Sequence, residues 1–110
     1  MKLTRDEKIW LDEYRRALAK RFPGKVERLL VYGSKARGDA HSDSDIDVLL
    51  VVKDEASGLK REMRRIGYLL AVTSDAVPSI MAYTHGEWAK REQSGSPFRK
   101  NVERDAVSVL

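Results

Sequence analysis

The sequence contains no cysteine, and it lacks the long apolar runs of membrane-spanning or secreted chains. Without cysteine, the protein forms no disulfides and no thiolate metal sites. No stretch approaches the roughly 20 consecutive apolar residues that a membrane-spanning helix needs. The first residues, Met1 to Glu7, contain no apolar segment of the kind found in secretion signals. We therefore expect a cytoplasmic protein that has no membrane partner.

An excess of charge of one sign is also missing. The 21 Lys and Arg residues are spread among 17 Asp and Glu residues, and they form no block longer than the pairs Lys60-Arg61 and Arg64-Arg65. The net charge of +4 permits a polyanionic partner, but a solvated charged surface is the simpler explanation. We do not expect nucleic acid as a partner.

What the sequence does contain is enough apolar material for one core. Hydrophobic residues make up 42% of 110 residues, which is typical of one globular domain. We expect a single domain over residues 1–110. Helical spacing predicts helices, and short apolar runs predict strands. Capping boxes at Thr4–Glu7 and Thr84–Glu87, and the N-cap Ser96 before Pro97, mark three of the helix starts. The expected helices are residues 4–22, 59–72, 84–88 and 97–104, and the expected strands are residues 25–32, 45–52 and 76–83.

With a helical turn after Ser34, the order of elements is α-β-α-β-α-β-α-α. This order predicts an α/β (α+β) domain with a sheet of at least three strands flanked by helices. Pro78 places the third strand at an edge of the sheet, since proline lacks the N–H that a central strand uses. It also argues against pairing of two sheets along that edge.

The loop that begins at Gly33 has the features of a phosphate site. Gly33 lacks a Cβ, so its backbone can adopt positive φ and approach an anion closely. Ser34 offers a hydroxyl group at the start of a helical turn. Lys35 and Arg37 add positive charge, and a guanidinium can contact two phosphate oxygens. Taken alone, the same residues also suit an ordinary turn with solvated basic side chains.

Two aspartates on the second predicted strand favour a phosphate site over an ordinary turn. Residues i and i+2 of a strand share a face, so Asp45 and Asp47 should point the same way, about 6.5–7 Å apart. They lead directly into the apolar run Val48 to Val52, where unpaired charge is costly. Two parallel carboxylates suit a pair of magnesium ions that bridge a phosphoryl displacement.

The spacing of these residues resembles that of a known superfamily. Gly33-Ser34, ten residues, then Asp45-Ile46-Asp47 is similar to the signature of DNA polymerase β-like nucleotidyltransferases. The longer string from Tyr32 to Asp47 resembles the minimal nucleotidyltransferases (MNT proteins). This resemblance implies the minimal nucleotidyltransferase fold, with a small mixed sheet, over about residues 1–90.

The resemblance also implies roles for the motif residues. Gly33 and Ser34, with Arg37 nearby, would bind the phosphates of ATP or another nucleoside triphosphate. Asp45 and Asp47 would be the catalytic residues and the ligands of Mg2+, with two ions expected. The reaction would transfer a nucleoside monophosphate, AMP if the donor is ATP, to an acceptor hydroxyl group.

One feature of active relatives is missing from the third predicted strand. Many of them carry a third carboxylate there, and Ala76 to Tyr83 contains no acid. Asp75 lies just before this strand and would serve if the strand began earlier. Asp75 also suits a turn that follows Thr73-Ser74.

Minimal members commonly act as antitoxins of HEPN-type ribonuclease toxins, and some modify the toxin on a tyrosine. The resemblance therefore implies a partner protein, with a HEPN-family toxin as the expected acceptor. The alternative is a catalytically weak or inactive binding module that neutralises such a partner by complex formation.

Overall fold

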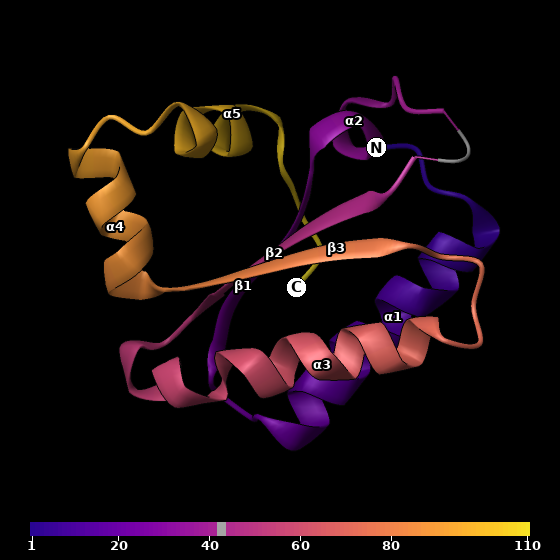
Figure 1. Ribbon diagram of the computed structural model, residues 1–110, viewed down its shortest axis with the longest axis horizontal. Coiled ribbons are helices and arrows are strands. Elements are labelled where there is room, and N and C mark those ends of the chain that lie inside the picture. The colour runs from indigo at the N-terminus through magenta and orange to yellow at the C-terminus, as the bar shows by residue number, and fades with distance from the viewer. Residues whose placement is uncertain (42–43) are drawn as a thin grey trace.

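A computed structural model describes residues 1–41 and 44–110 of the chain and shows a four-stranded mixed sheet between helices (Figure 1). The strands are β1 (Val26–Tyr32), β2 (Ile46–Val52), β3 (Pro78–Thr84) and β4 (Val107–Ser108). Their spatial order is β3-β2-β1-β4. β1 is antiparallel to β2 and to β4, whereas β2 and β3 are parallel. The predicted α/β class and mixed sheet are confirmed.

The helices are α1 (Arg5–Arg21), α2 (Gly33–Arg37), α3 (Lys60–Ala71), α4 (His85–Gln93) and α5 (Pro97–Asp105), with a 3₁₀ turn over Asp54–Leu59. The two predicted capping boxes are present, with Thr4 and Thr84 as N-caps that pair with Glu7 and Glu87. Ser96 caps α5 and Pro97 occupies its first turn, as predicted. None of the helices in the described parts of the chain is both long and apolar enough to span a membrane.

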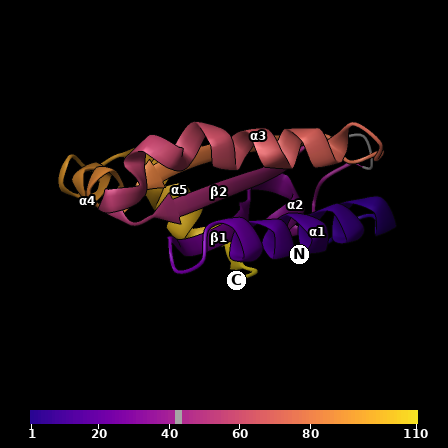
Figure 2. The ribbon, with the colours of Figure 1, turned by 90° about the horizontal axis from the view of Figure 1, so that it is seen from below.

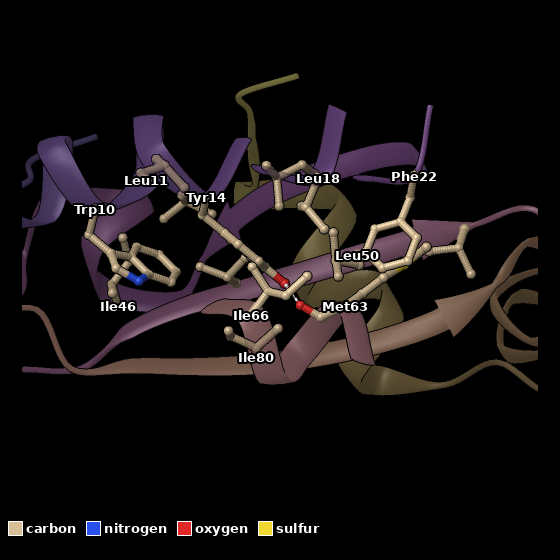
Figure 3. Close-up of a cluster of buried hydrophobic side chains, with 14 of the residues drawn as sticks. Trp10, Leu11, Tyr14, Leu18, Phe22, Ile46, Leu50, Met63, Ile66 and Ile80 are labelled. Atoms are coloured by element: carbon tan, nitrogen blue, oxygen red, sulfur yellow. Dashed lines mark hydrogen bonds between the residues drawn. The ribbon is translucent and has the colours of Figure 1, made fainter. Parts of the chain in front are cut away.

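α1 and α3 cover one face of the sheet, which is the lower face in Figure 1. Figure 2 shows both helices running along the strands. The larger core lies between these two helices and the sheet, and Trp10, Tyr14 and Met63 are fully buried in it (Figure 3). The Trp10 indole donates to the carbonyl of Gly67, and the Tyr14 hydroxyl donates to that of Met63. Both tryptophans are core residues, since Trp88 is buried on the opposite face of the sheet.

α4 and α5 cover the other face of the sheet, the upper face in Figure 1. Leu30, Leu49 and Val51 point to this side and pack against Trp88 of α4 and Val102 of α5. Because side chains alternate along a strand, Asp47 points to the same side as Leu49. The upper layer covers only part of this face, and α2 lies beside the start of β2.

The two edges of the sheet end differently. β4, which the sequence analysis missed, is two residues long and pairs with β1. β3 forms the other edge, as Pro78 predicted, and two of its outward N–H groups are already bonded. The Ile80 N–H donates to the Tyr68 hydroxyl at 2.9 Å, and the Thr84 N–H donates to Glu87 at 2.8 Å. An edge occupied in this way is poorly suited to pairing with another strand.

Candidate functional site

Gly33 brings the end of β1 against Asp47 of β2. Its φ of +71° lies in the left-handed region, which glycine adopts without the steric cost of a Cβ. A Cβ at this position would lie 2.5 Å from Asp47 Oδ2. A glycine is therefore needed at this position for two reasons, the turn into α2 and the close approach to the carboxylate. Ser34 follows at the start of this short helical turn and is half-buried.

Asp47 and Asp45 lie at the start of β2, where the resemblance placed them, although β2 begins at Ile46 and Asp45 precedes it. Asp47 is half-buried, and Asp45 is exposed. Burial raises the pKa of Asp47, the negative charge of Asp45 raises it further, and Arg37 opposes the shift. The site thus concentrates negative charge that a cation would relieve.

Lys35 does not contribute to this site, and its expected role as a phosphate-binding cation is wrong. Its ammonium lies 3.1 Å from Glu7 Oε1, and the two side chains are 3% and 4% exposed. Lys35 also donates to the carbonyl of His41, and its own carbonyl accepts from the Lys2 N–H. The short motif loop is thereby attached to α1. The sequence of the loop does not indicate that Lys35 is buried, because its partner Glu7 lies on another element, α1.

Arg37 has the opposite environment, because its side chain is 44% exposed. It donates to Asp39 at 3.2 Å and lies 3.8 Å from Asp105 at the end of α5. It is also close enough to influence the pKa of Asp47. A guanidinium held by two carboxylates in solvent can exchange one of them for phosphate oxygens. Its expected contact with nucleotide stays a prediction.

The position beside Asp47 on β3 is Ser79. The parallel register pairs Asp47 with Ser79, and Asp47 pairs with Tyr32 on β1. Asp75 lies in an exposed bend, and β3 begins three residues later. The structure thus places Asp75 outside the strand, as the turn alternative has it. Sequence reasoning did not single out Ser79, since the offset between parallel strands is set by the whole sheet.

Tyr32 of β1 is the other neighbour of Asp47 in the sheet. Burial, together with the charge of Asp47, raises the pKa of Tyr32 to about 12. Its hydroxyl therefore keeps its proton at neutral pH.

The donor set suits magnesium bound together with a nucleotide. Mg2+ takes oxygen ligands and is usually held by one or two carboxylates plus substrate phosphates. In the described parts of the chain no group of three or more His, Cys, Asp or Glu side chains is placed to hold an ion. Asp45 and Asp47 would thus supply part of a coordination shell. Ser42 and Asp43, which complete the motif string, lie outside the described residues.

Comparisons with known proteins identify the family to which the chain is similar. The family model described as "Nucleotidyltransferase domain" matches residues 11–105. Two proteins of Methanocaldococcus jannaschii, each named "Putative protein adenylyltransferase", are similar to part of the chain. One is 37% identical over 46 residues, which is 42% of this chain and 46% of that protein. The other is 36% identical over 44 residues, 40% of this chain and 44% of that protein. The matches thus span less than half of these relatives.

Two solved structures share the fold. One is a protein from Sulfolobus solfataricus described as a "putative nucleotidyltransferase", with a TM-score of 0.56 and 23% identity over 91% of this chain and 76% of that one. The other is a toxin–antitoxin structure with AMP-PNP, with a TM-score of 0.55 and 18% identity over 97% of this chain and 73% of that one. At these identities the likeness concerns the fold alone.

Proposed function

Because the chain belongs to the nucleotidyltransferase-domain family, we propose that it transfers a nucleoside monophosphate from a nucleoside triphosphate to a hydroxyl group of a partner protein. ATP is the proposed donor, so that AMP would be the group transferred. The observation that carries the proposal is the approach of Gly33 to Asp47, where any Cβ would collide with the carboxylate. This contact joins the phosphate loop to the acidic pair in one site.

In this proposal each residue of the site has a separate task. The backbone at Gly33 and the hydroxyl of Ser34 bind the β- and γ-phosphates, and Arg37 adds a guanidinium to the same phosphates. Asp45 and Asp47 hold the cations that accompany the nucleotide. Magnesium, when bound there, would neutralise phosphate charge and orient the reacting oxygens.

The reaction is a single displacement at the α-phosphorus. The acceptor oxygen forms a bond to this phosphorus, and the bond from it to the bridging oxygen of the β-phosphate breaks. Pyrophosphate leaves with that electron pair, and the acceptor proton passes to solvent. The protein contributes positioning and charge stabilisation, which dominate catalysis of this type.

The proposed acceptor is a HEPN-family toxin, with this chain as its antitoxin. The motif between Tyr32 and Asp47 supports this assignment, since antitoxins of this type share it. A second candidate function is neutralisation of the same partner by binding alone. It is favoured by one observation, the serine at position 79 where a third carboxylate would face the pair.

A labelling experiment separates the two functions. The chain is incubated with α-labelled ATP, Mg2+ and a HEPN-type partner protein, in parallel with the double variant Asp45→Asn/Asp47→Asn. Asp12→Asn, which changes an exposed carboxylate on α1, is the matched control. We expect the wild type and the control to label the partner and the double variant to lose at least about a hundredfold in rate. If no protein labels the partner and all three still neutralise it, the chain is a binding module.

A further inference from the structure

The sheet places the phosphate loop and Ser79 on opposite sides of Asp47. On one side is β1, which leads into Gly33 and the phosphate loop, and on the other side is β3 with Ser79. In an in-line displacement the nucleophile enters opposite the leaving group. If pyrophosphate leaves on the side of Gly33, the acceptor hydroxyl enters over Ser79. This step rests on the proposed function.

From Ser79 a strip of side chains runs along β3 toward α4. Ser79, Met81 and Tyr83 alternate with residues that point to the lower core, so all three face the same side as Asp47. Met81 is 37% exposed there, although the upper core begins beside it. Phe98 of α5 borders the strip, with its ring centroid 6.5 Å from that of Tyr83. An exposed apolar side chain between a reactive site and an aromatic wall is a ready contact for an apolar group.

The far end of the strip carries a positive charge. The Arg91 guanidinium lies 4.8 Å from the ring centroid of Tyr83 and 5.7 Å from that of Phe98. No carboxylate of the described residues forms a salt bridge with Arg91, whereas Arg99 beside it pairs with Glu92. The two aromatic rings fix the guanidinium over the sheet. Its one side-chain hydrogen bond among the described residues is a long one, 3.5 Å to the Ser96 hydroxyl, so the guanidinium is available to a carboxylate of a bound chain.

We propose that Ser79, Met81, Tyr83, Phe98 and Arg91 form an acceptor-binding strip for an extended segment of the partner protein. The segment carries its reactive hydroxyl over Ser79, an apolar side chain against Met81 and an acidic side chain at Arg91. Residues two apart on a strand are about 6.6 Å apart, and residues four apart about 13 Å. The preferred acceptor therefore has a Tyr, Ser or Thr, an apolar residue two positions away and an Asp or Glu two positions beyond that.

Three synthetic peptides test this strip. The first, Tyr-Gly-Leu-Gly-Glu with blocked ends, has the proposed pattern. The second replaces leucine by asparagine, and the third replaces glutamate by lysine. Each is incubated with the full chain, ATP and Mg2+, and AMP transfer is measured by mass spectrometry. The binding of ATP with Mg2+ is measured separately by calorimetry.

Variants of the strip are compared with matched variants elsewhere. Met81→Glu is matched by Leu69→Glu, which changes an exposed apolar residue of α3. Arg91→Ala is matched by Arg64→Ala, which also lies on α3. Met81→Leu and Arg91→Lys are the conservative variants. We expect Met81→Glu to slow transfer to the first peptide about tenfold and Arg91→Ala about threefold, as single interface contacts commonly do. ATP binding by all variants, and peptide transfer by both matched controls, should stay within about twofold of the wild type. Met81→Leu and Arg91→Lys should lose less transfer than Met81→Glu and Arg91→Ala, because they keep the apolar contact and the positive charge.

The outcomes distinguish the strip from the proposed function on which it depends. Faster labelling of the first peptide, with loss of that preference in Met81→Glu and Arg91→Ala, supports the strip. Equal labelling of all peptides, or equal loss in the matched controls, overturns it and leaves the transferase intact. Binding of ATP without labelling of any peptide also overturns it. If the wild type binds no ATP with Mg2+, the proposed function itself fails and the strip fails with it.

Discussion

The buried ion pair of Glu7 and Lys35 provides the sharpest test of how the motif loop is held. The two charges lie 3.1 Å apart with almost no exposure to solvent. Glu7→Gln removes one charge, while glutamine can still serve in the capping box with Thr4. The substitution therefore isolates the loss of the charge, and it leaves the ammonium of Lys35 buried without its partner.

The size of the effect follows from this burial. Removing one member of a buried pair costs about 3–5 kcal/mol. Unfolding entropy is about 2.1 cal/mol/K per residue, so 110 residues give about 0.23 kcal/mol/K. The melting temperature should fall by about 13–22 °C. Affinity for ATP with Mg2+ should fall as well, because α2 carries both Lys35 and the phosphate-binding residues.

Thermal denaturation of matched variants checks this reasoning. Glu62→Gln makes the same chemical change in an exposed pair with Arg21, and it should shift the melting temperature by only a few degrees. The double variant Glu7→Gln/Lys35→Met should recover part of the lost stability, since it leaves no unpaired charge. If the melting temperature of Glu7→Gln falls by less than about 4 °C, or if that of Glu62→Gln falls by the same amount, the role assigned to the pair is refuted.

Three further predictions concern the site and the sheet edge. Gly33→Ala should lower affinity for ATP with Mg2+, measured by calorimetry, at least about tenfold, because the new Cβ is strained at positive φ and clashes with Asp47. Gly95→Ala is the control: Gly95 has the same φ of +71° but no neighbour within 4 Å, so the affinity should not change. Tyr68→Phe leaves the Ile80 N–H without its acceptor and should cost about 1 kcal/mol, with faster amide exchange at Ile80; unchanged exchange would contradict the bond. Ser79→Asp adds a third carboxylate beside the acidic pair, so Mg2+ should raise its melting temperature more than that of the wild type, and an equal rise would count against a metal at this position.

Much of the fold could be predicted from short-range sequence patterns. Thr4, Thr84 and Ser96 marked the starts of helices because a capping side chain acts within one turn of its own residue. Pro78 marked an edge strand for an equally local reason, the missing N–H. β4 escaped prediction because its two residues form a strand only by pairing with β1, which is distant in sequence.

The same difference between local and long-range interactions applies to the candidate site. The spacing from Gly33 to Asp47 resembles the signature of nucleotidyltransferases, and a motif confined to one short stretch of chain can be recognised without knowing how the rest of the chain packs around it. Lys35 was misread, because its partner Glu7 lies on α1, and the burial of the pair depends on how that helix packs. Residue type alone cannot separate a solvated lysine from a buried one.

The Gly33–Asp47 motif, and with it the family, could thus be read from the order of residues along the chain. The neighbours of that motif were decided only by the tertiary structure. Ser79 stands beside Asp47 because β2 and β3 are parallel in one particular register, and a shift of one residue would turn the opposite set of side chains to this face. The packing of α1, α3, α4 and α5 on both faces selects that register, and no local pattern in β3 encodes it.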